Sequence, residues 1–292
     1  AVGQAAKNFR GLGMDLVNHC VNDLLTTGAR PAFFLDYIGL GHAERDDAVE
    51  IVEGMAQACN AAGCVLIGGE TAVMPGLYSG DDMDVVGVIA GYVHRSDLLG
   101  GEAAELGDVL IGIPSNSPHT NGYSLIRRVF DIENHPEVLD ETEWSPDIGR
   151  SLGDALLEPH RSYLEPITPV LGMIRGMAHI TGGGLEENLE RILPDGCRAV
   201  IESGSWPVTP VFDWIAELGQ VHGDGVDVGD VVAGGGGGVP DDGDRVAVDE
   251  GVVVAGVAGQ GDLGLCGGGV DGVDDLVGGV GGGDVAGVVG DR

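Results

Sequence analysis

The clearest shortage in this sequence is of positive charge. Lys and Arg together number 14 among 292 residues, against 47 Asp and Glu, and the formal net charge is −33 at pH 7. A surface this acidic repels the phosphate backbone of nucleic acids and the headgroups of anionic lipids. We therefore expect neither nucleic acid nor a membrane as partner.

Cysteine and long hydrophobic runs are also scarce. The five cysteines are scattered without the spacing of a zinc site or a disulfide framework, which fits reduced thiols. No window holds the ~18 uninterrupted apolar residues of a membrane-spanning helix, and no signal peptide is recognisable. These absences predict a cytoplasmic protein.

Residues 221–292 lack aromatic side chains and differ in kind from the rest. Of these 72 residues, 25 are glycine, and most of the others are Ala, Val, Asp or Glu, whose codons all begin with G. Such a composition offers little apolar surface to balance the entropy cost of ordering the chain. We interpret this tail as a reading-frame or base-calling artefact; the alternative is a natural low-complexity tail.

One stretch organises the rest of the chain. Residues 64–67 form a short apolar run typical of a buried strand, and Gly68-Gly69 predicts a tight turn after it. The turn would present Glu70 beside Thr71, and a carboxylate held in this way is a hard oxygen ligand suited to Mg²⁺. An ordinary solvated glutamate is the alternative for this tetrapeptide alone.

Helix and strand patterns divide residues 1–220 into two α/β domains, 1–105 and 106–220. Apolar periodicity predicts helices over 14–27, 46–62, 125–130, 152–171, 185–193 and 211–218. Apolar or β-branched runs predict strands over 32–38, 64–67, 84–93, 108–113 and 177–180. On the first helix, Asp15, His19, Asn22 and Thr26 form a polar stripe that by default faces solvent.

Two polar loops precede helices in the second domain. One is residues 114–124, and the other is Thr181-Gly182-Gly183-Gly184. Free backbone N–H groups at a helix start can hold a phosphate, although plain capping loops would have the same composition. Neither loop matches the P-loop or the dinucleotide fingerprint.

Taken together, residues 11–220 closely resemble the phosphoribosylformylglycinamidine cyclo-ligase family, also called aminoimidazole ribonucleotide synthetases. Six blocks in the family's order carry the resemblance: Gly13–Val17 with Val21–Leu24, Phe33–Tyr37, Gly68–Thr71 with Met74–Gly76, Asp84–Gly87, His119–Arg127 and His179–Gly184.

The resemblance implies an α+β fold of two domains, in which the N-terminal sheets of two subunits join into a barrel across a homodimer. It also implies that ATP closes formylglycinamidine ribonucleotide to aminoimidazole ribonucleotide in purine biosynthesis, releasing ADP and phosphate. The formyl (amide) oxygen is phosphorylated, a nitrogen closes the ring, and phosphate leaves. Mg²⁺ neutralises the triphosphate charge.

The family's functional residues map onto matching positions of this chain. The resemblance implies Mg²⁺ ligands at Asp23, Glu70 and Asp84, and ATP contacts from Asp15, Asn22, Asp23, Glu70 and Thr71. It implies substrate contacts from Thr120, Gly122, Ser124, Thr181, Gly182, Gly183 and Gly184. His119, Asn121 and His179 are the candidate catalytic residues, with a histidine moving a proton; a structural role is open for each histidine.

Three departures from the family pattern bear on activity. The family's N-terminal Asp-Gly-Val-Gly-Thr-Lys loop is absent, Ser117 stands where glycine is common, and the tail replaces an Arg-Thr-Phe-Asn stretch. We therefore expect the chain as written to be poorly active. The alternatives are a sister ATP-using enzyme, such as a thiamine-monophosphate kinase or a selenophosphate synthetase, and an inactive remnant of the cyclo-ligase.

Overall fold

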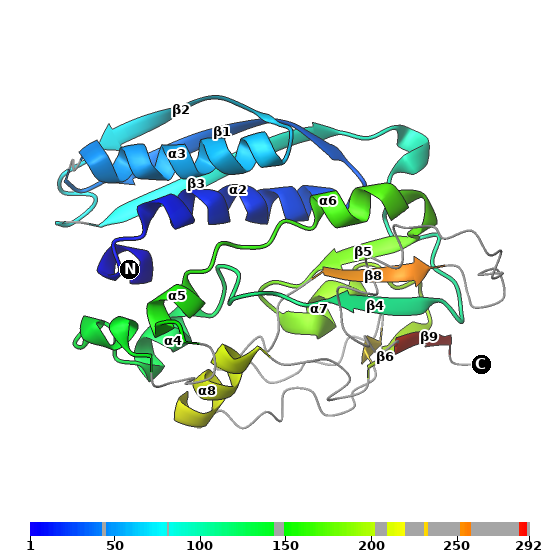
Figure 1. Cartoon of the computed structure of the whole chain (residues 1–292). Coiled ribbons are helices and arrows are strands. Elements are labelled where there is room, and N and C mark those ends of the chain that lie inside the picture. Colours follow the sequence, from blue (N-terminus) through cyan, green and yellow to red (C-terminus); the bar gives the residue numbers. More distant parts are fainter. Residues whose placement is uncertain are drawn as a thin grey trace.

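Two α/β units make up the computed structural model. It describes residues 1–42, 45–80, 82–142, 149–201 and 209–219, and the backbone of 231–232, 252–257 and 286–290. The N-terminal unit lies above the C-terminal unit in Figure 1, and the segment that joins α5 to α6 crosses between them. The predicted two-domain α+β fold is confirmed. Within the described ranges, no helix combines the length and the apolar character needed to cross a bilayer.

Two long helices form one layer of the N-terminal unit. After the short helix α1 (Val2–Ala5), helix α2 (Phe9–Leu25) begins at Asn8, whose side chain accepts a hydrogen bond from the Gly11 N–H at 3.0 Å. Val17 and Val21 recur on one face of α2 and are fully buried. Helix α3 (Arg45–Ala61) packs closely against α2. Both predicted helices are confirmed, although α2 begins before the predicted start.

A three-stranded sheet forms the other layer, in the order β2-β1-β3. Strand β1 (Arg30–Leu40) is parallel to β2 (Val65–Val73) and antiparallel to β3 (Met83–Tyr92). Phe34 and Ile38 of β1 point towards the helices and are fully buried. The opposite, outer face of the sheet is exposed and apolar.

The predicted turn at Gly68-Gly69 is wrong, because strand β2 runs through both glycines. A register shift between Phe34 and Leu35 of β1 accommodates the extra residue, so that pairing continues to Val73. A Cβ atom at Gly69 would lie 2.3 Å from an Asp36 carboxylate oxygen, so this position is glycine for packing and not for a turn. Glu70 and Thr71 consequently lie within the strand.

The C-terminal unit is built on a six-stranded sheet in the order β5-β8-β4-β9-β6-β7. Its strands are β4 (Val109–Ile113), β5 (Gly176–His179), β6 (Cys197–Val200), β7 (Val231–Val232), β8 (Val252–Val257) and β9 (Ala286–Gly290). Strands β7, β8 and β9 come from the glycine-rich tail. The rest of residues 220–292 lies outside the described residues, so the artefact interpretation of the tail stays a prediction.

The remaining helices are short. They are η1 (Arg95–Asp97), α4 (Tyr123–Val129), η2 (Pro136–Asp140), α5 (Leu152–Leu156), α6 (Leu164–Ile167), η3 (Thr168–Met173), α7 (Gly184–Glu190) and α8 (Pro210–Gly219). The continuous helix predicted over 152–171 is wrong, since it divides into α5, α6 and η3. Proline explains the breaks, because Pro159 and Pro169 each remove a helical hydrogen bond and clash with the preceding turn.

Candidate functional site

The polar stripe of α2 faces the C-terminal unit and not the solvent. Asn18 donates to the His160 carbonyl at 2.7 Å, and the His160 N–H donates to Asp15 Oδ1 at 2.8 Å. Asn22 donates to the Arg161 carbonyl at 2.8 Å and accepts from the Tyr163 N–H at 3.0 Å. The irregular segment between α5 and α6 is therefore held by side chains of a helix about 140 positions earlier in the chain.

Asp15 and Asn22, which were predicted to contact ATP, thus form hydrogen bonds with the backbone of the segment between α5 and α6. Asn22 is completely buried. Burial raises the pKa of Asp15 to about 7, even though the backbone hydrogen bond from His160 lowers it. Their predicted contacts with nucleotide stay predictions.

Asp23, one turn after His19, meets the end of strand β5. His179 Nδ1 lies 2.7 Å from Asp23 Oδ1, and His19 Nε2 lies 3.4 Å from Asp23 Oδ2. Partial burial alone would raise the pKa of Asp23, but the hydrogen bonds from His179 and His19 hold it well below its usual range. This carboxylate is therefore ionised at physiological pH.

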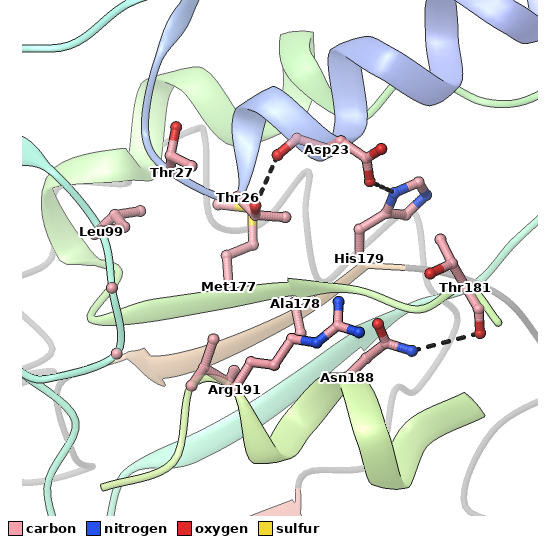
Figure 2. Close-up of a pocket in the computed structure, with 13 residues that line it drawn as sticks. Asp23, Thr26, Thr27, Leu99, Met177, Ala178, His179, Thr181, Asn188 and Arg191 are labelled. Atoms are coloured by element: carbon pink, nitrogen blue, oxygen red, sulfur yellow. Dashed lines mark hydrogen bonds and ion pairs between the residues drawn. The ribbon is translucent and has the colours of Figure 1, made fainter. Parts of the chain in front are cut away.

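A cavity of about 220 Å³ opens beside this pair (Figure 2). Its wall is made by Asp23, Thr26, Thr27, Leu99, Gly100, Gly101, Met177, Ala178, His179, Thr181, Asn188, Arg191 and Ile192. Ligand pockets usually measure about 300–1,000 Å³, so this cavity has room for one polar group of a larger substrate. An acid, an imidazole and a guanidinium all border the space, which suits a phosphate or an amide.

The glycine loop 181–184 is fixed from behind by Asn188. The buried Asn188 side chain donates to the Gly184 carbonyl at 2.7 Å and, more weakly, to the Thr181 and Gly182 carbonyls at 3.4 Å. Of the predicted substrate contacts in this loop, Thr181 lines the cavity and Gly182 and Gly183 are exposed next to it. The loop's place beside the cavity agrees with its predicted use, but no contact with substrate is tested.

The other predicted loop, 114–124, reaches the same region through His119 and Thr120. Thr120 Oγ1 lies 3.1 Å from His19 Nδ1, and Asn121 donates to the His119 carbonyl at 3.1 Å. His119 is buried with its Nε2 atom 2.6 Å from Asn116 Oδ1, and burial lowers its pKa to about 3. Gly122 and Ser124 are exposed at the start of α4.

Four histidines gather where α2, the two loops and β5 meet. The rings of His119 and His160 stack with centroids 3.9 Å apart, and His160 lies edge-on to His179 at 5.5 Å. The ring of His19 is 5.2 Å from that of His179. Sequence reasoning missed His160, together with Asn188 and Arg191. Pro159 was the available signal for His160, because it should have ended the predicted helix and placed the histidine in a loop.

Glu70, Thr71 and Asp84 do not lie beside the cavity but on strands β2 and β3 of the N-terminal sheet. Glu70 pairs in register with Tyr37, which alternates with the buried Phe34 and Ile38 and so belongs to the outer face of the sheet. Asp84 pairs with Gly39 on the same face, and all three predicted residues are exposed. Among the described residues, Asp23, Glu70 and Asp84 form no common group of metal ligands within one chain. That these residues bind the same ion stays a prediction, and it would require more than one chain.

The arrangement of a helix-backed mixed sheet and a second α/β unit is shared with solved structures of other proteins. A structure titled hydrogenase maturation protein HypE matches with a TM-score of 0.60 and 18% identity, covering 95% of this chain and 74% of that one. Thiamine-monophosphate kinase from Stenotrophomonas maltophilia matches with a TM-score of 0.61 and 16% identity, covering 97% and 77%. At these identities the likeness establishes the fold alone.

Comparison with related sequences identifies the family of this chain. The N-terminal domain described as AIR synthase related protein matches residues 2–93, and the corresponding C-terminal domain matches 105–242. The chain belongs to this family. The phosphoribosylformylglycinamidine cyclo-ligase of Caldicellulosiruptor bescii is 47% identical over 213 residues, 72% of this chain and 62% of the relative. That of Myxococcus xanthus is 48% identical over 222 residues, 75% and 64%. The chain thus spans less than two thirds of the length of these relatives.

Proposed function

We propose that this chain carries the ATP-dependent ring closure of formylglycinamidine ribonucleotide to aminoimidazole ribonucleotide, with release of ADP and phosphate. The observation that carries the proposal is the identity of 47–48% to relatives named for this reaction. The blocks His119–Arg127 and His179–Gly184, far apart in the sequence, both lie at the junction of the two units. A reaction of purine biosynthesis that consumes ATP takes place in the cytoplasm, which is where we place this protein.

In the proposed reaction, His179 moves the proton and Asp23 orients it. His179 borders the cavity, and its Nδ1–H donates to Asp23 Oδ1, which fixes the tautomer and leaves Nε2 as the proton acceptor. His119 is the weaker candidate, because its Nε2 atom already interacts with Asn116. Asn121 and Thr120 would position the amide, and Gly122, Ser124 and residues 181–184 would hold the ribonucleotide phosphate.

Mg²⁺ would neutralise the triphosphate charge when bound. Asp23 fits such a role in part, since its side chain is 55% exposed and ionised, while its neighbours are imidazoles and not oxygen donors. Glu70 and Asp84 offer exposed oxygen ligands on the outer face of the sheet, and Thr71, the next residue after Glu70, is also exposed but belongs by register to the other face. One ion that touches Asp23 and Glu70 therefore requires two chains, and we propose a homodimer joined through the outer sheet faces into a barrel.

Substrate-dependent turnover tests the reaction. The purified chain should release ADP and form an aminoimidazole product only when both ATP and formylglycinamidine ribonucleotide are present, at a rate below that of an intact relative. Asp23→Asn should lower kcat by roughly 10–100-fold, because an outer partner of an active histidine is lost. Asp131→Asn, an exposed aspartate at the end of α4, is the matched control and should leave kcat unchanged.

The second candidate is a kinase of the thiamine-monophosphate type, since an enzyme of that name shares the fold. ADP release that depends on thiamine monophosphate would support it and overturn the ring-closure proposal. An inactive remnant predicts no binding at all. If ATP with Mg²⁺ at about 100 times its Kd adds less than the ~2.7 kcal/mol expected for a bound ligand, the remnant is favoured.

A further inference from the structure

The histidine cluster at the junction contains unused ligand atoms. Nitrogen atoms from His19, His160 and His179 all lie within 4.8 Å of one another, which is the one such group among the described residues. His160 is only 1% exposed, and neither of its ring nitrogens has a hydrogen-bond partner. His179 Nε2 is likewise buried and unpartnered. Buried polar atoms in native proteins nearly always have partners, so these atoms point to a missing ligand.

The surroundings fit a cation that prefers nitrogen. Two of the three imidazoles are held in place by a second interaction, His179 Nδ1 by Asp23 at 2.7 Å and His19 Nδ1 by Thr120 at 3.1 Å. A carboxylate that accepts from the other nitrogen of a ligating histidine is the usual outer partner of such metal ligands. Burial lowers the pKa of His160, so that its imidazole is neutral, the form that binds metals.

We propose that His19, His160 and His179 form a binding site for a divalent transition metal such as Zn²⁺, Co²⁺ or Ni²⁺, with Asp23 or water in the fourth position. The site joins α2 of the N-terminal unit to two segments of the C-terminal unit, so the ion ties the units together. In a tetrahedral site with bonds of about 2.0–2.1 Å, neighbouring nitrogens lie about 3.3 Å apart. The rings need to close by no more than about 1.5 Å.

This ion is distinct from the Mg²⁺ of the proposed reaction. Mg²⁺ selects oxygen ligands in an octahedral arrangement, whereas three imidazoles select zinc, cobalt or nickel. Asp23 and His179 take part in both proposals, and a metal on His179 Nε2 would block that atom as a proton acceptor; metal binding to the histidines is therefore measured without ATP or substrate. Failure of one proposal therefore leaves the other standing.

Calorimetric titration of the full, untagged chain with Zn²⁺ and Co²⁺ tests the site, with thiols kept reduced. We expect one equivalent to bind tightly, Co²⁺ to show the visible bands of nitrogen and oxygen ligation, and excess Mg²⁺ not to displace it. His160→Phe should weaken binding by more than about 100-fold, since loss of even an outer partner costs about 10–100-fold. His19→Phe, at a partly exposed position, should do the same if His160→Phe fails to fold.

His135→Phe is the matched control, because His135 is exposed and belongs to no such group. It should bind metal as the unmodified chain does. The proposal is overturned if the unmodified chain binds no tight equivalent, if neither ligand variant weakens binding, or if Co²⁺ shows thiolate charge-transfer bands, which would assign the ion to cysteines.

Discussion

At the scale of single residues, desolvation decides the charge of the junction. His119 and His160 are buried there, and burial lowers the pKa of both imidazoles, that of His119 to about 3. Asp15 lies against the same segment, and burial raises its pKa to about 7. Burial in the junction therefore disfavours protonation of these two imidazoles and favours protonation of Asp15.

Acid should destabilise the chain through His160. In the unfolded chain its pKa returns to about 6.5, so below that pH the unfolded state binds a proton that the folded state refuses. The stabilising contribution is complete above pH 6.5 and is lost as the pH falls. When the pH is lowered from 7 to 5, the unfolding free energy of the unmodified chain should fall by about 2 kcal/mol more than that of His160→Phe.

Urea unfolding at both pH values, with a chelator present, measures this difference. The opposite contribution of Asp15, which gains a proton on folding in the same range, is present in both proteins and cancels in the comparison. An equal loss in the two proteins would show that His160 is protonated in the folded state.

Asn22 holds the second unit through two hydrogen bonds to the backbone of the segment between α5 and α6. Asn22→Ala would leave the Arg161 carbonyl and the Tyr163 N–H without their side-chain partner in a buried place. We expect a loss of about 2–3 kcal/mol in unfolding free energy, measured by urea titration. Asn60→Ala, at an exposed position of α3, should change stability by less than about 0.5 kcal/mol, and a similar loss in both variants would contradict the argument.

At the scale of elements, contact between two helices sets the geometry of the N-terminal unit. A Cβ atom at Gly13 of α2 would lie 1.9 Å from the Ile51 carbonyl oxygen, and one at Gly54 of α3 would lie 2.0 Å from that of Arg10. The backbones therefore touch at two reciprocal points. Because α2 carries the polar stripe, its position relative to the sheet also places Asp23.

Gly13→Ala should consequently destabilise the chain, despite the higher helix propensity of alanine. Overpacking against a backbone atom costs about 1–3 kcal/mol, more than the ~1 kcal/mol that alanine contributes in a helix. Thermal unfolding should show a lower Tm. Gly112→Ala, in strand β4 with open space around its Cβ position, is the control and should keep its Tm; an unchanged Tm for Gly13→Ala would mean that the helices can move apart.

At the scale of the whole molecule, the outer face of the N-terminal sheet exposes apolar side chains that the fold of one chain does not explain. Val65 and Ile67 of β2 and Val88 of β3, the two strands that flank β1, are 60%, 56% and 57% exposed. Contiguous exposed apolar side chains of this kind mark an interaction surface. This is the face that the proposed homodimer would cover.

Val88→Glu should convert the dimer into monomers, because an unpaired carboxylate would be buried in an apolar interface. Sedimentation equilibrium at several protein concentrations measures the effect. Val49→Glu, on an exposed part of α3, is the control and should stay dimeric. A monomeric unmodified chain, or a dimeric Val88→Glu, would refute the interface.

Local pattern was enough for the main elements and the family. Apolar spacing predicted α2 and α3, and β-branched runs predicted β1, β3, β4 and β5 close to their observed bounds. Six ordered blocks were enough to name the family. Two predictions were wrong because one local rule outweighed another. At Gly68-Gly69 the glycines predicted a turn, but strand pairing continues through them. Around Pro159 the apolar periodicity predicted one helix, but proline ends a helix.

The sequence by itself determined the charge, the order of helices and strands and the family, because these depend on residues close together in the chain. Only the tertiary structure decided that the polar stripe of α2 is an inner surface, that Asp23 pairs with His179, and that Glu70 faces away from both. The first two facts depend on contacts between residues some 140–156 positions apart, and no local periodicity records which segment covers a helix face. The orientation of Glu70 depends on how β2 pairs with β1.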